Sequence, residues 1–251
     1  MITLEHIETD ITSACNNVCV CCDHYSPLLP KRFVKPEDYR RELAAAAKLI
    51  HAKEYSLLGG EPTLHPQLLD ILTIARESGI CDRLQVITNG QTIRNQAPEF
   101  WERIDSLWIT RYTGKIPSAD IDWAKGMCME RGLEFVLKDR GILSRTFTAH
   151  EVSEGEAQGR FSRCHLKHCN ILDGGYLYLC CAAPFVAPLL IGLPEGTDGI
   201  DLSTATEADV QAYLARPGAF QGCKRCVEVD GIIFPWREST RANWRADSEM
   251  P

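Results

Sequence analysis

The sequence lacks several features that mark large classes of protein. Among its 251 residues no apolar run is long enough to span a membrane, and the first ten, MITLEHIETD, lack the basic and apolar regions of a signal peptide. We therefore expect a soluble, cytoplasmic protein with no membrane partner. Positive charge is not in excess, because the formal net charge is -7, which argues against general binding of nucleic acid. There is also no repeat of fixed period and no low-complexity tract.

Cysteine, in contrast, is abundant and unevenly placed. Of the 12 cysteines, four lie between positions 15 and 22, four between 164 and 181, and two at 223 and 226. Disulfides are rare in a reducing cytosol, whereas clustered thiols there are typical of metal sites. Cys81 and Cys128 stand alone, and we expect them to be small buried residues without further function.

Short apolar runs alternate with amphipathic segments over the first 140 residues. This alternation predicts an α/β fold with a parallel sheet and helical crossovers, arranged as a barrel or partial barrel. From about residue 141 the chain becomes polar, irregular and cysteine-rich, so we predict two domains, 1–140 and 141–251. The expected strands are 6–13, 55–60, 84–90, 106–112 and 133–139, and the expected helices are 36–52, 66–79, 97–103 and 118–131.

Unusual residues follow four of these strands. Cys15 follows the first, GGEP (59–62) the second, TNG (88–90) the third, and Thr110 with Arg111 ends the fourth. Active sites of such folds lie at the C-terminal ends of the strands. The sequence therefore predicts that these segments line one site.

The stretch CNNVCVCCDHYSP (15–27) contains a C-x3-C-x2-C motif. Its thiols, Cys15, Cys19 and Cys22, can hold three irons of a [4Fe–4S] cube and leave the fourth iron open to a ligand. A structural zinc site would use four protein ligands instead. Cys21 or His24 could complete such a set, so zinc remains an alternative on this loop alone.

The cysteine motif after a first strand, with GGEP after the second, resembles the radical S-adenosylmethionine (SAM) enzymes. The resemblance covers about residues 5–140 and implies a partial (β/α)6-type TIM barrel. It also implies that Cys15, Cys19 and Cys22 hold a [4Fe–4S] cluster whose free iron binds SAM. An external one-electron donor of the flavodoxin or ferredoxin type would reduce the cluster, and SAM cleavage would then give a 5′-deoxyadenosyl radical.

By the same resemblance, the strand ends contact SAM. The residue before the third cysteine is usually aromatic in this family and lies near the adenine, but here it is Cys21. The adenine contact is therefore expected from the backbone or from a neighbour such as His24 or Tyr25. The residues expected to bind SAM are Gly59, Gly60, Glu61, Pro62, Thr88, Asn89, Thr110 and Arg111.

The later cysteines resemble the short (twitch or SPASM-like) auxiliary-cluster domains of these enzymes. Asp173-Gly174 is a tight-turn signal that predicts a hairpin between the first two thiols of this region and the next two. The resemblance implies a second [4Fe–4S] cluster, with a four-cysteine zinc knot as the alternative. The expected ligands are Cys169, Cys180, Cys223 and Cys226, with Cys164 as the substitute for Cys169.

The expected function is the oxidation of a secondary alcohol on a small molecule such as a sugar or aminocyclitol, with the auxiliary cluster as the electron acceptor. The short C-terminal domain resembles that of aminocyclitol dehydrogenases. A radical epimerase, with a cysteine as hydrogen donor, and a non-catalytic zinc protein are the alternatives. Candidate catalytic residues are Cys164, Cys181, His24 and Tyr25, and other substrate-side candidates are Arg111, Asp139, His150, Trp236 and Arg237.

Overall fold

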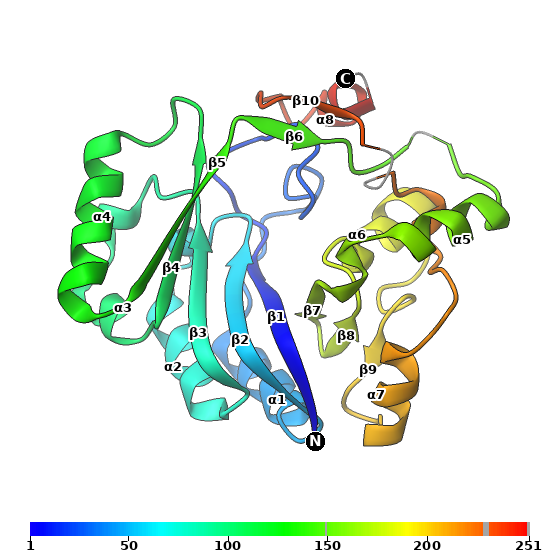
Figure 1. The fold of residues 1–251 in the computed structure, drawn as a ribbon, viewed down its shortest axis with the longest axis horizontal. Coiled ribbons are helices and arrows are strands. Elements are labelled where there is room, and N and C mark those ends of the chain that lie inside the picture. The colour runs from blue at the N-terminus through cyan, green and yellow to red at the C-terminus, as the bar shows by residue number, and fades with distance from the viewer. Residues whose placement is uncertain (149, 228–230, 250–251) are drawn as a thin grey trace.

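A computed structural model describes residues 1–148, 150–227 and 231–249. Its centre is an eight-stranded sheet in the order β5-β4-β3-β2-β1-β7-β8-β9 (Figure 1). The pairs from β5 to β1 are parallel, as the alternating sequence predicts. These five strands are β1 (Ile2–Thr12), β2 (Ile50–Gly59), β3 (Cys81–Thr88), β4 (Ser106–Tyr112) and β5 (Glu134–Arg140).

Four helices follow the parallel strands in turn and cover one face of the sheet (Figure 1). The main apolar core lies between this face and the helices, where Ile7, Leu57 and Val86 are fully buried. The opposite face carries polar side chains and is left for the site. The helices are α1 (Pro36–Ala46), α2 (Leu68–Ser78), α3 (Pro98–Glu102) and α4 (Ser118–Arg131).

One predicted helix is wrong at its C-terminal end. The apolar spacing predicts a helix over 36–52, but α1 stops at Ala46, and β2 already begins at Ile50. Ile50 fits either pattern locally, and its pairing with Ile2 of β1 decides the outcome. The strand at 106–112 and the helix at 118–131 are confirmed, as is the end of α2 at Gly79, whose φ of 65° is left-handed.

The chain after β5 does not build a separate sheet. β7 (Asn170–Asp173) pairs in parallel with β1, and β8 (Tyr176–Tyr178) and β9 (Ile200–Asp201) extend the same sheet in antiparallel fashion. The hairpin between β7 and β8 turns at Gly174 and Gly175, both with positive φ, as the Asp-Gly signal predicts. Residues 141–251 therefore continue the core sheet, and a boundary near 140 remains a prediction.

The rest of the C-terminal region packs around this hairpin and over the strand ends (Figure 1). β6 (Ile142–Ser144) and β10 (Ile233–Pro235) form a second, two-stranded sheet at the top of the view. The helices here are α5 (Glu154–Arg163), α6 (Ala183–Val186), α7 (Glu207–Leu214) and α8 (Trp244–Glu249). Within the described ranges, every helix is too short or too polar to cross a membrane.

Candidate functional site

A cavity of about 460 Å³ opens at the C-terminal ends of the parallel strands. This is the edge at which sites of such folds lie. The loop after β1, the strands β2 to β5 and the C-terminal region all contribute to its wall. Of the residues expected to form the site, those that line the cavity are Cys15, Cys19, Cys22, His24, Gly59, Gly60, Glu61, Thr88, Asn89, Thr110, Cys169 and Cys181.

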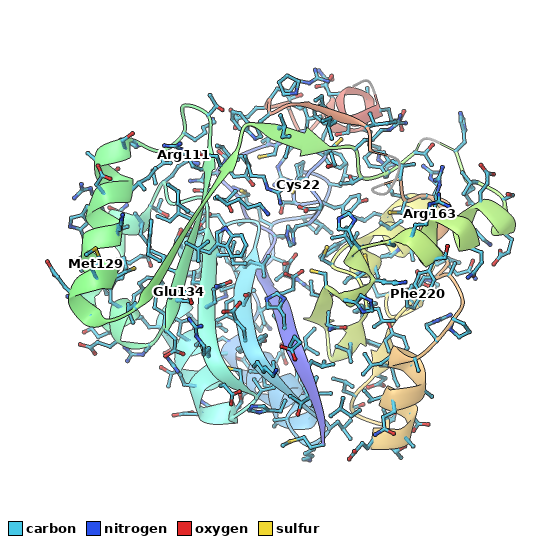
Figure 2. The ribbon with its side chains drawn as sticks, viewed as in Figure 1. Cys22, Arg111, Met129, Glu134, Arg163 and Phe220 are labelled. Carbon is cyan, nitrogen blue, oxygen red and sulfur yellow. The ribbon has the colours of Figure 1, made fainter. Side chains whose placement is uncertain are left out.

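The three thiols of the C-x3-C-x2-C motif lie together on this wall, and Figure 2 shows Cys22 between the parallel strands and the C-terminal region. Burial raises the pKa of Cys15 to about 12 and that of Cys19 to about 11, and it raises the pKa of Cys22 well above its ordinary value. Burial thus disfavours the thiolate form of all three, and a cation bound beside them would favour it.

Two of these sulfurs also accept hydrogen bonds from nearby N–H groups. The Trp236 Nε1–H donates to Cys19 Sγ over 3.3 Å, and the Asn17 backbone N–H donates to Cys15 Sγ over 3.4 Å. Donors aimed at sulfur are a usual means of tuning the potential of an iron–sulfur cluster. Three thiols on one wall, with N–H donors behind two of them, fit the three cysteine-held corners of a [4Fe–4S] cluster.

Cys21 and Tyr25 both contact the C-terminal region, although Cys21 also lines the cavity. Cys21 is buried, and its thiol donates to the carbonyl of Ser248 in α8 over 3.3 Å. Tyr25 is fully buried and packs against Phe147 and Trp244, with ring centroids 6.1 and 5.8 Å away, and it does not line the cavity. Both residues have positive φ, and we assign them to shaping the loop, so Tyr25 is dropped as a candidate catalytic residue.

The glycines after β2 allow two backbone segments to touch. A Cβ on Gly60 would lie 2.3 Å from the carbonyl oxygen of Ala14, and one on Gly59 equally close to that of Thr12. The Gly60 N–H donates to Thr12 and the Glu61 N–H to Ala14, at 2.6 and 2.8 Å. The glycines thus hold the end of β2 against the residues that lead into Cys15.

The Glu61 carboxylate is occupied by the protein itself. It is fully buried and accepts hydrogen bonds from Thr88 Oγ1 at 2.5 Å and from the Asn89 backbone at 2.8 Å, as well as from Thr63. Burial raises the pKa of Glu61, although these donors oppose the shift. Glu61 therefore holds the end of β2 against the end of β3, so we assign it a positioning role. Pro62 does not line the cavity.

The loop after β3 is also tied to the cysteine loop. Asn89 Nδ2 donates to Asn16 Oδ1 over 2.7 Å, and Gln91 Nε2 donates to Asn17 Oδ1 over 2.9 Å. Neither amide pair was predicted, because no local pattern links residues more than 70 positions apart. The ends of β1, β2 and β3 thus form one hydrogen-bonded rim around the thiols.

Thr110 and Arg111 point to opposite sides of β4. Thr110 lines the cavity, whereas Arg111 pairs with Asp139 of β5 through two hydrogen bonds and lies outside it (Figure 2). Successive side chains of a strand face opposite ways, which explains the split. Arg111 and Asp139 are therefore dropped from the proposed binding residues. His150 is exposed, and Arg237 donates to the Asp247 carbonyl.

His24 remains on the cavity wall, and β1 adds acidic neighbours to it. Its Nδ1 lies 2.9 Å from Oδ1 of Asp10. Burial alone would lower the pKa of His24, but Asp10 and Asp23 outweigh it and raise the pKa well above the ordinary value. The two carboxylates thus favour the protonated form of His24, in which both ring nitrogens are donors.

Sequence reasoning missed five charged residues of the cavity, two of which are Asp23 and Glu54. Glu8 of β1 lines one side, and Lys138 and Arg140 of β5 line the other. Burial raises the pKa of Glu8 to about 7. The sequence did offer a signal for cavity residues of this kind, namely a charged residue within a predicted strand on the face that carries the site. The cavity therefore has one acidic and one basic wall.

The later cysteines divide into two groups. Cys169 and Cys181 line the cavity, whereas Cys164, Cys180, Cys223 and Cys226 lie outside its wall. The pKa of Cys223 is raised to about 12, chiefly by burial, with Cys180 and Cys164 among the nearby groups that contribute. Cys164, the expected substitute, thus lies near Cys223.

Relatives and solved structures can be compared with this site. "GTP 3',8-cyclase" of Tolumonas auensis is 31% identical over 163 residues, covering 59% of this chain and 48% of the relative. "Probable GTP 3',8-cyclase" of Pyrococcus abyssi is 31% identical over 97 residues, covering 39% of the chain and 31% of the relative. The chain thus spans about half or less of these relatives.

The structure of BtrN in complex with AdoMet and 2-DOIA has the same fold, with a TM-score of 0.51 at 15% identity. The matched region covers 85% of this chain and 82% of BtrN. A model of the Radical SAM superfamily matches residues 9–138, the segment that carries the three thiols and the rim around them. The chain therefore belongs to the radical SAM superfamily, whose members bind a [4Fe–4S] cluster and SAM.

Proposed function

We propose that this radical SAM enzyme oxidises a secondary alcohol of a small sugar-like or aminocyclitol-like molecule. The observation that carries the proposal is the cavity, which at about 460 Å³ is of the size that holds one small molecule. Its opposed acidic and basic walls suit a compact polar substrate. The similarly folded BtrN was solved with AdoMet and 2-DOIA, which agrees with a cofactor and a small ligand bound together.

Cys15, Cys19 and Cys22 would hold the SAM cluster, with Trp236 and Asn17 donating to its sulfurs. When bound and reduced by an external one-electron donor, the cluster and SAM supply the radical that removes a hydrogen atom from the substrate. The loops that end in Gly60 and Asn89, together with Thr110, are placed to bind SAM.

The substrate itself would lie between the two charged walls. His24 and Glu8 are placed to hydrogen-bond its hydroxyl or amino groups, and Lys138 and Arg140 to bind an electron-rich side. Lys138 is held over the Trp108 ring, 5.3 Å from its centroid, which fixes its direction.

We further propose that an auxiliary [4Fe–4S] cluster accepts the second electron of the oxidation. Cys180, Cys223 and Cys226 were expected as its ligands, and for the fourth we now favour Cys164 over Cys169. The electrostatic effects of Cys164 and Cys180 on Cys223 support that choice. Four cysteine ligands leave no iron open, which favours electron transfer over direct binding of substrate.

The curated relatives suggest a second candidate, a reaction on GTP. The basic wall of Lys138 and Arg140 would suit a triphosphate. Epimerisation is the third candidate, and it would use the cavity thiol of Cys181 as the hydrogen donor. A non-catalytic zinc protein is disfavoured by the family match.

One experiment separates these functions. The reconstituted, reduced protein is incubated with SAM and with aminocyclitols, sugars or GTP, and 5′-deoxyadenosine is measured. We expect an aminocyclitol or sugar to stimulate its formation and to yield a ketone two mass units lighter. Stimulation by GTP alone would overturn the proposal. A product of unchanged mass in ordinary water that gains one deuterium at carbon in deuterated buffer would indicate epimerisation instead.

A further inference from the structure

Two thiols and one carboxylate meet at the junction of β1 and the C-terminal region. The ligand atoms of Glu8, Cys169 and Cys181 all lie within 4.8 Å of one another, which no other group of three such residues achieves in the described ranges. They come from three segments: β1, the residue before β7, and the turn after β8. The site is thus a product of the tertiary fold.

The carboxylate of this group is buried, and the imidazole of His24 is a nearby group that favours its charged form. Glu8 is 5% exposed, and the thiol of Cys169 donates to its Oε1 over 3.3 Å. Among the described residues no lysine or arginine forms an ion pair with it. Buried charges are normally paired or coordinate metals. The nearby His24 is already bound to Asp10.

We propose that Glu8, Cys169 and Cys181 bind a single divalent cation of borderline softness, Zn²⁺ or Fe²⁺. Two thiolates and one carboxylate are a donor set that such ions accept in tetrahedral geometry. Three protein ligands leave the fourth position open, which is the arrangement of catalytic rather than structural sites. All three residues line the cavity, so the open position faces it.

This site is distinct from the proposed auxiliary cluster. Cys180 and Cys181 are adjacent, yet only Cys181 lines the cavity. The Cys180 thiol interacts with both Cys181 and Cys223, so it lies between the two groups of thiols. We assign Cys180 to the cluster, and Cys181 with Cys169 to the cation.

The open position defines what the ion would bind. A hydroxyl or amine of the substrate would take it, so that the ion fixes that group and makes a bound hydroxyl more acidic. This role rests on the proposed function, whereas binding of the ion does not.

Zinc uptake tests the site directly. The reconstituted holoenzyme is treated with a mild chelator, incubated with Zn²⁺, and desalted. Zinc and iron are then measured per chain, and the zinc environment is examined by X-ray absorption. We expect about one zinc with two sulfur neighbours and the remainder oxygen or nitrogen. No zinc uptake, or zinc with four sulfurs, would overturn the proposal.

Variants make the assignment specific. Glu8→Gln and Cys181→Ser are expected to lower zinc uptake at least tenfold, and Cys169→Ser likewise, with iron unchanged in all three. Cys81→Ser is the matched control, because Cys81 begins β3 at the end away from the cavity. This variant is expected to keep both metals. Loss of iron from Cys169→Ser or Cys181→Ser would instead place these thiols in a cluster and sink the proposal. Retained iron also shows that a variant has folded.

These results are independent of the substrate. If no aminocyclitol or sugar stimulates 5′-deoxyadenosine formation but zinc binds as described, the proposed reaction fails and the ion site stands. If zinc does not bind but a ketone forms, the ion site fails and the proposed reaction stands.

Discussion

The two cysteine-rich regions reach the cavity in different ways. In the first, Cys15, Cys19 and Cys22 lie in one loop that follows a single strand, and all three line the cavity. In the second, the thiols come from the end of α5, the two ends of the β7–β8 hairpin and the segment after α7. Only two of those six thiols line the cavity, Cys169 and Cys181.

The difference shows what spacing along a chain can encode. A loop of eight residues brings its thiols together whatever the rest of the fold does, so its motif can be read locally. Thiols from separate segments are grouped by packing between elements, and the same spacing is compatible with several ligand sets. The thiols of the first region are therefore grouped by local sequence, and those of the second by tertiary packing.

The largest effect is expected from the first region. Cys15→Ala, Cys19→Ala or Cys22→Ala should each remove about four irons per chain and abolish 5′-deoxyadenosine formation, because three ligands are the minimum for the open cluster. Iron analysis and chromatography of the nucleoside measure this. Full activity in any of the three variants would mean that the first region is not the SAM site.

The next test compares Cys164 and Cys169 of the second region, the two alternatives for one ligand position of the auxiliary cluster. Cys164→Ser should lose about half of the iron, whereas Cys169→Ser should keep it, because Cys164 acts with Cys180 on Cys223. Iron content and electron paramagnetic resonance of the reduced protein separate the two. The reverse pattern would restore the ligand set expected from the sequence.

The rim around the first region is expected to tolerate no added methyl group. Gly60→Ala places a Cβ 2.3 Å from the Ala14 carbonyl oxygen, and we expect a loss of roughly 1–3 kcal/mol in the free energy of unfolding. Gly126→Ala in α4 is the control, because nothing lies within 4 Å of its added Cβ. Thermal unfolding measures both, and equal stability of the two variants would contradict the packing argument.

A smaller effect is expected where the second region contacts the first. Trp236→Phe keeps a ring beside Tyr112 but removes the N–H donor to Cys19. Loss of a hydrogen bond to sulfur should lower the cluster's reduction potential, by on the order of 50 mV. A redox titration measures it, with Trp123→Phe in α4 as the control. An unchanged potential would show that this contact only packs.

The smallest effect is expected outside both regions. Arg111→Ala should leave the affinity for SAM unchanged, because the guanidinium pairs with Asp139 away from the cavity. Equilibrium binding of SAM to the reconstituted protein tests this. A loss of affinity of tenfold or more would return Arg111 to the binding residues and would mean that its pairing changes when the cofactor binds.

Much of the core could be predicted from the sequence. The strand at 106–112 and the helix at 118–131 are found as predicted, and both fit the alternation of strands and helices along the first 140 residues. The extent of the first helix could not be predicted, since residues 50–52 fit a helix locally and join β2 only through their pairing with β1.

The site was predicted unevenly, for similar physical reasons. The thiols and glycine-rich strand ends carry local motifs, and the structure brings them to one cavity. Glu61 was expected to assist SAM, but its carboxylate is engaged by Thr88 and Asn89, which come from a different strand end. Glu8 shows the opposite case, because its role depends on Cys169, 161 positions away in the chain.

The contact of Trp236 with Cys19 also has a consequence for biogenesis. Val20 donates to the carbonyl of Arg237 and Trp244 to that of Cys19, so the last residues of the chain close over the first cysteine loop. On the ribosome this loop emerges more than 200 residues before its cover. A nascent chain that has not reached Trp236 therefore presents this loop without its cover.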